Sequence, residues 1–117
     1  MISGLNLQAT VDFILPDDND NPTVWKIGII ASDLLAQIGA QGKDNPIQAS
    51  IKFLQLGLKG WTNLEGVEYK TEKTTLGGIE CDAVPIDLIK RIPLNVVMAL
   101  SEKVFEINHL TPGERKN

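Results

Sequence analysis

The chain has 117 residues, a net charge of −4, 43% hydrophobic residues and only 5% aromatic residues. This composition predicts a single domain over residues 1–117 and excludes a disordered chain. The acidic balance gives no electrostatic reason to bind nucleic acid or an anionic membrane surface, so we expect neither as a partner. A single cysteine and an N-terminus without a charged, apolar leader are typical of the cytoplasm.

An N-terminal β-hairpin is the first predicted element. Residues 5–15 alternate between apolar and polar side chains, which is typical of a strand with one buried face. That face would carry Leu5, Leu7, Ala9, Val11 and Phe13. Residues 17–22, DDNDNP, are rich in turn formers. Alternation resumes over residues 23–30, so we expect these two strands to pair over the loop.

Helices are predicted in most of the remaining chain. The best-marked one follows Asn45, a favourable N-cap residue, with Pro46 at the first helical position. Pro93 introduces the last helix. The predicted helices cover residues 33–38, 46–59, 86–92 and 94–108.

Residues 62–83 have no helical period. Gly77 and Gly78 are a turn signal, so this segment predicts either a second β-hairpin or a long ordered loop. The expected fold class is α+β and helix-dominant, with an N-terminal β-hairpin packed beside three to four helices. The polar tail, residues 110–117, is expected to fray.

The helices over residues 46–59 and 94–108 are apolar around much of their circumference. The apolar arc of the first spans about 200°, against about 100° for a simple surface helix. One alternative is that both helices are central and covered by the sheet. We predict instead that part of this surface binds a second copy or another protein. The predicted partner-binding residues are Phe53, Leu56, Trp61, Met98 and Phe105, with Trp61 as the anchor.

The acidic loop resembles a calcium ligand set only superficially. If Asp17 were the first position of an EF-hand loop, Pro22 would occupy the position of the glycine. Gly28 would replace the terminal glutamate. We expect this segment to be a solvated turn. A metal-binding module or small enzyme that uses Asp17, Asp18 and Asp20 is a rival hypothesis.

Cys81 and His109 are the two further residues that could act as reactive groups. Cys81 has carboxylate neighbours, which should raise its pKa rather than activate the thiol. His109 follows the last helix without a second histidine or a recognisable nucleophile motif. We therefore expect no catalytic residue, metal or cofactor, and a protein that is not an enzyme.

Three stretches of the C-terminal half resemble small tail-region proteins of bacteriophages and prophages. They are GLKGW at residues 57–61, DLIKRIP at residues 87–93 and ALSEKVFEINHLTPGERKN at residues 99–117. Together they are similar to the tail assembly chaperone group, whose genes lie near the tape-measure gene.

This resemblance implies a non-enzymatic protein of the bacterial cytoplasm. Such chaperones coat the hydrophobic tape-measure protein and help tail-tube subunits assemble around it, so either is an implied partner. The N-terminal strands depart from an all-helical chaperone, which leaves open a minor structural component of the tail or head–tail junction. The acidic charge also leaves open an inhibitor or antitoxin-type protein with a basic target.

Overall fold

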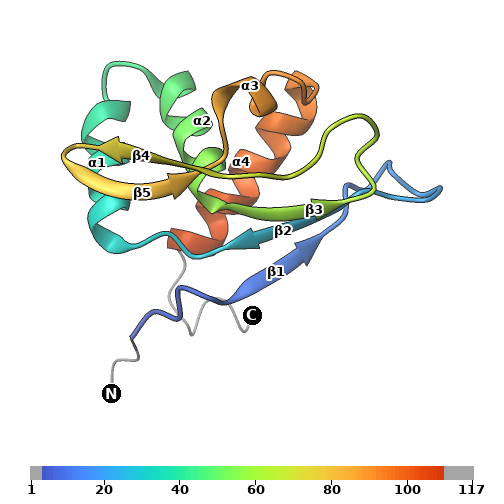
Figure 1. Cartoon of the computed structure of the whole chain (residues 1–117), viewed down its shortest axis with the longest axis horizontal. Helices are drawn as coiled ribbons and strands as arrows, with labels where there is room; N and C mark the ends of the chain where they lie inside the picture. Colours follow the sequence, from blue (N-terminus) through green and yellow to red (C-terminus); the bar gives the residue numbers. More distant parts are fainter. Residues whose placement is uncertain (1–3, 110–117) are drawn as a thin grey trace.

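The computed structural model describes residues 4–109, apart from the side chain of Gln41. The expected frayed tail therefore lies outside the described residues. In chain order the elements are β1 (Thr10–Phe13), β2 (Val24–Gly28), α1 (Ser32–Gly42), α2 (Pro46–Gly57), β3 (Leu58–Thr62), β4 (Glu72–Leu76), β5 (Ile79–Ala83), α3 (Ile86–Ile89) and α4 (Leu94–His109). Figure 1 shows these elements along the chain.

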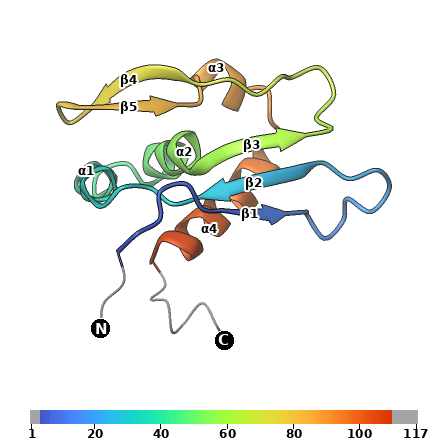
Figure 2. The ribbon, with the colours of Figure 1, turned by 60° about the horizontal axis from the view of Figure 1, so that its bottom comes forward.

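The strands form two antiparallel sheets. One has three strands in the order β1-β2-β3, and the other is the β4–β5 hairpin. In Figure 2 the hairpin forms a separate layer above α2, and α4 packs against the three-stranded sheet through β2. No helix among the described residues is long and apolar enough to cross a lipid bilayer.

The prediction of a helix-dominant fold is wrong. The described residues form an α+β fold with 40% helix and 23% strand, in two small antiparallel sheets. The helix predicted over residues 46–59 ends at Gly57, and the chain enters β3 at Leu58. Leu58 and Trp61 suit a buried helix face and a buried strand equally well by sequence. Pairing with β2 decides for the strand, because Trp61 then lies directly opposite Trp25.

The two alternatives for residues 62–83 are resolved in favour of a hairpin. β4 and β5 pair antiparallel, and Leu76 lies opposite Ile79. The two residues between them, Gly77 and Gly78, have φ values of +58° and +82°. Positive φ at both central positions is what a two-residue turn of type I′ requires, and glycine adopts it without steric cost.

The predicted N-terminal hairpin is confirmed, but its first strand is short and poorly covered. β1 pairs with β2 only from Thr10 to Phe13. A turn precedes it, in which the N–H of Ala9 donates to the carbonyl of Asn6. The expectation of a buried apolar face is wrong, since Leu5, Leu7 and Val11 are 51%, 49% and 47% exposed. Leu5 and Leu7 lie before β1 begins, and the helices that cover the sheet face pack on β2 rather than on β1.

The main core lies between the three-stranded sheet and the helices α2 and α4. Ile27, Leu54, Leu100 and Val104 are fully buried there. Gly57 lets α2 approach α4 closely, because a Cβ at this position would overlap the Val104 side chain.

Candidate functional site

Exposed apolar side chains gather where α2, α3 and α4 meet. Ile47 is 66% exposed and Leu94 is 73% exposed. Both lie in the first turns of their helices, beside Pro46 and Pro93. Ile86 and Met98 are also exposed, at 40% and 44%.

These four residues line one hollow, which we call the α2–α4 groove. Its volume is about 430 Å³. The other residues that line it are Ser50, Ile51, Ile89, Lys90, Ile92, Pro93 and Val97. Lys90 is the only charged side chain in this lining. Grooves that take small ligands or side chains have volumes in this range and a similar apolar character. The groove therefore offers apolar contact area with little charge.

The N-termini of α2 and α4 form two sides of this groove. Residues next to each N-terminus determine where the helix begins. Asn45 caps α2, as predicted, because its Oδ1 accepts a hydrogen bond from the backbone N–H of Gln48 at 3.2 Å. Pro93 precedes α4, and its carbonyl accepts the N–H of Val97 at 3.0 Å. Apolar residues placed just after each start project from the first turn rather than into the core.

The seam between α2 and α4 continues beyond the groove. Its middle is closed by Ser101, whose Oγ donates to the carbonyl of Ser50 at 3.1 Å. One turn further along both helices, the Phe53 and Phe105 rings pack edge to face with centroids 5.8 Å apart. The His109 ring stacks on Phe105 at 3.9 Å. Phe105 is 51% exposed, so the seam ends in a second apolar patch.

The predicted partner-binding residues divide into two groups. Met98 lies in the groove, and Phe105 and the half-buried Phe53 form the patch at the far end of the seam. Leu56 and Trp61 are only 5% and 8% exposed. These two side chains belong to the core and do not reach the surface with the other three.

Trp61 is held inward by specific contacts. Its Nε1 donates to the carbonyl of Val67 at 2.9 Å. Its ring packs edge to face against Trp25 at 5.8 Å and against Tyr69 at 4.9 Å. A tryptophan satisfied in this way is a core residue, which the sequence position alone does not reveal.

Sequence reasoning missed Ile47, Ile86 and Leu94. The available signal was their place directly after Pro46, Pro85 and Pro93. Only the tertiary structure, in which α3 contacts α2 and the start of α4 lines the same hollow, brings these three residues together.

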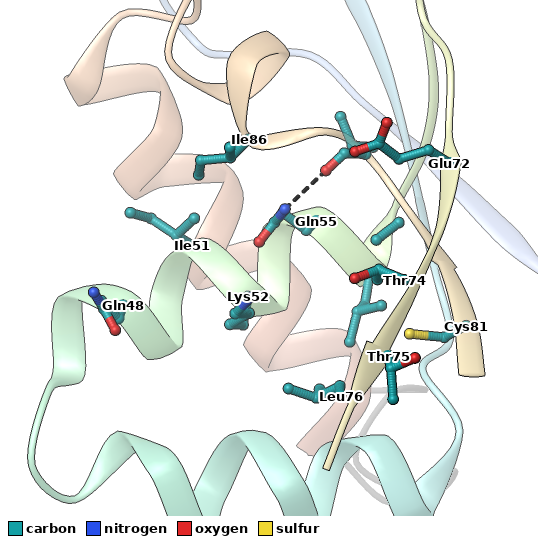
Figure 3. A pocket seen from close by; sticks show the side chains of 13 residues that line it. Gln48, Ile51, Lys52, Gln55, Glu72, Thr74, Thr75, Leu76, Cys81 and Ile86 are labelled. Atoms are coloured by element: carbon teal, nitrogen blue, oxygen red, sulfur yellow. Dashed lines mark hydrogen bonds between the residues drawn. The ribbon is translucent and has the colours of Figure 1, made fainter. Parts of the chain in front are cut away.

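A second hollow of about 420 Å³ separates α2 from the β4–β5 hairpin. Figure 3 shows its mixed lining, with Lys52 and Gln55 from the helix facing Thr74 and Cys81 from the hairpin. The Nε2 of Gln55 is already used, since it donates to the carbonyl of Val84 at 2.9 Å. Ile51 and Ile86 line both hollows, so the two meet at these side chains.

Cys81 is half-buried at the wall of this second hollow. Burial, and next to it the Asp82 carboxylate, raise the pKa of the Cys81 thiol. The predicted effect of neighbouring carboxylates is thereby confirmed, although burial is the larger cause. A raised pKa makes the thiol a weak nucleophile at neutral pH.

The acidic loop at residues 17–22 is held by a hydrogen bond between a side chain and the backbone. The Oδ2 of Asp18 accepts a hydrogen bond from the N–H of Thr23 at 2.9 Å, while Asp17 and Asp20 are exposed. Among residues 4–109, no three His, Cys, Asp or Glu side chains come close enough together to hold a metal ion.

No known protein family, curated protein or solved structure matches this chain. Geometry alone therefore marks the α2–α4 groove as the candidate site. Its rim carries the most exposed apolar side chains of the described helices.

Proposed function

We propose that this chain is a non-enzymatic assembly protein of a bacteriophage or prophage, acting in the bacterial cytoplasm. Its α2–α4 groove would bind an apolar helical segment of another protein. The partner we propose is the tape-measure protein, which makes the chain a tail assembly chaperone. The observation that carries this proposal is the exposure of Leu94, Met98 and Ile47 around one apolar hollow.

The shape of the site favours a helical partner. Exposed apolar side chains at positions 94, 98 and 105 follow one face of α4, at spacings of four and seven residues. A partner helix presents apolar residues at the same spacings and can lie along such a row. With Lys90 as the only charge in the groove lining, the groove suits the apolar face of that helix.

The resemblance to tail assembly chaperones supplies the identity of the partner. A tape-measure protein is long, helical and apolar before the tail tube surrounds it. A small acidic protein bound along it would add charge and solubility, because the chain has a net charge of −4. No cofactor enters this role.

The test is co-expression with the tape-measure protein of the same phage. We expect the wild-type chain to keep that protein soluble and to co-purify with it. Leu94→Glu places a charge in the apolar contact and should weaken binding more than tenfold, which corresponds to about 1.4 kcal/mol or more. Ala36→Glu is the matched control, since Ala36 is also an exposed apolar residue on a helix but does not line the groove.

Two outcomes would contradict the proposal. One is a tape-measure protein that stays insoluble with the wild-type chain. The other is equal binding by Leu94→Glu and Ala36→Glu, because a binding site in the groove must distinguish them. Selective binding of a tail-tube or head–tail subunit instead would replace the chaperone role by a structural one.

A further inference from the structure

The outer edge of β1 has no partner strand in the part of the chain that the structure describes. β1 is the terminal strand of the order β1-β2-β3, and no strand within residues 4–109 pairs with its other side (Figure 2). Open edges are templates for pairing with another chain, and lysine or proline on the edge is one common protection. Residues 4–15 contain neither lysine nor proline.

Exposed apolar residues are concentrated on β1 and in the segments directly before and after it. Leu5, Leu7, Val11 and Ile14 are four of the nine large apolar side chains that are exposed within the described chain. Residues directly opposite each other in a sheet point to the same face. Val11, opposite Ile27, therefore lies on the face where Ile27 is fully buried, yet Val11 itself is 47% exposed.

Helical cover of this face stops at β1. Phe13 lies opposite the buried Trp25 but is only half-buried, and the ammonium of Lys103 from α4 lies 5.6 Å from its ring centroid. The apolar layer of the sheet thus extends one strand beyond the helices. An added strand would continue that layer.

Charge does not oppose pairing here. Asp12 is the only charged residue in residues 4–15. Its Oδ1 forms an ion pair with the Nζ of Lys26 on β2 at 3.0 Å. The partner strand therefore meets an edge whose single charge is already compensated.

We propose that β1 pairs antiparallel with β1 of a second copy of this chain, centred on Val11. In this register Val11 faces Val11, and Thr10 faces Asp12. A register centred on Asp12 would instead place two carboxylates opposite each other, which is unfavourable. The sequence around β1 is therefore self-complementary in one register and not in its neighbour.

The pairing joins two three-stranded sheets into one sheet of six strands. An antiparallel pair of identical strands has its two-fold axis perpendicular to the sheet, so both copies of α4 lie on the same face. The α2–α4 groove takes no part and remains open in both copies. This dimer is therefore independent of the function proposed above.

Disulfide trapping tests the register. Opposite Cα atoms in an antiparallel pair are about 4.5–5.5 Å apart, within the range that a disulfide spans. In a Cys81→Ser background, Val11→Cys should form a covalent dimer under mild oxidation at least tenfold faster than Thr10→Cys. Cysteine at position 10 would face Asp12 of the other copy rather than itself.

Sedimentation velocity provides the second measurement. We expect a concentration-dependent dimer for the wild type and a monomer for Val11→Glu, with unchanged circular dichroism because Val11 is half exposed. Leu94→Glu should remain dimeric. The proposal is overturned if the wild type is monomeric at all concentrations, if both cysteine variants cross-link equally, or if only Leu94→Glu dissociates the dimer.

Discussion

Asn108, near the end of α4, accepts a hydrogen bond at its Oδ1 from the backbone N–H of Ile30, 2.7 Å away. The same side chain donates through Nδ2 to the carbonyls of Gly28 at 3.2 Å and Val104 at 2.9 Å. One amide group thus joins the last turn of α4 to the residues that follow β2. Ile30 is only 2% exposed, so water has little access to replace this bond.

We predict that Asn108→Ala lowers the free energy of unfolding by about 1–3 kcal/mol, because it leaves a buried N–H without an acceptor. Urea denaturation measures the change. The control is Asn95→Ala, an exposed position on the same helix, where about 0.5 kcal/mol or less is expected. Equal effects of the two substitutions would show that the Asn108 bonds add nothing to stability.

Two glycines in helices should respond in opposite directions to alanine. Gly57→Ala forces a methyl group into the space of Val104, and overpacking of this kind destabilises by about 1–3 kcal/mol. Gly39→Ala in α1 meets nothing within 4 Å and should stabilise by about 0.5–1 kcal/mol through helix propensity. Thermal unfolding of both variants checks the signs. A stabilising Gly57→Ala would mean that α2 and α4 are not in close contact there.

The reactivity of Cys81 should follow the charges around it. Burial and Asp82 raise the pKa of this thiol, while Lys52 lowers it. A raised pKa leaves less thiolate at pH 8, so alkylation by iodoacetamide should be slower than for a free thiol and should accelerate as the pH rises. Asp82→Asn should speed the reaction and Lys52→Gln should slow it. The same direction of change in both variants would contradict this electrostatic account.

Among the residues predicted to bind a partner, truncation to alanine should lower the free energy of unfolding more at core positions than at surface positions. Leu56→Ala removes a side chain that is 5% exposed and should cost about 2–5 kcal/mol. Phe105→Ala removes a ring that is half exposed and should cost clearly less. Chemical denaturation of the isolated chain measures both. A larger loss for Phe105 would place the Phe53–Phe105–His109 cluster in the core instead of on a binding surface.

Local signals in the sequence determined several elements. Asn45 and Pro46 set the start of α2, and Gly77-Gly78 set the turn between β4 and β5. These features depend on backbone conformations and hydrogen bonds within a few residues, so they can be read from neighbouring side chains alone. The candidate groove was indicated only in part, through Met98.

Tertiary structure alone decided which apolar residues are covered. Leu58 and Trp61 belong to β3 because this segment pairs with β2. The same pairing packs Trp61 against Trp25. Leu7 and Val11 follow the alternation that is typical of a buried strand, yet Leu7 lies in the turn before β1, Val11 lies on the edge strand, and both remain exposed. The spacing of apolar residues along the sequence predicts which side chains share a face. Whether anything covers that face depends on contacts between segments far apart in the chain, and those contacts carry no local signature.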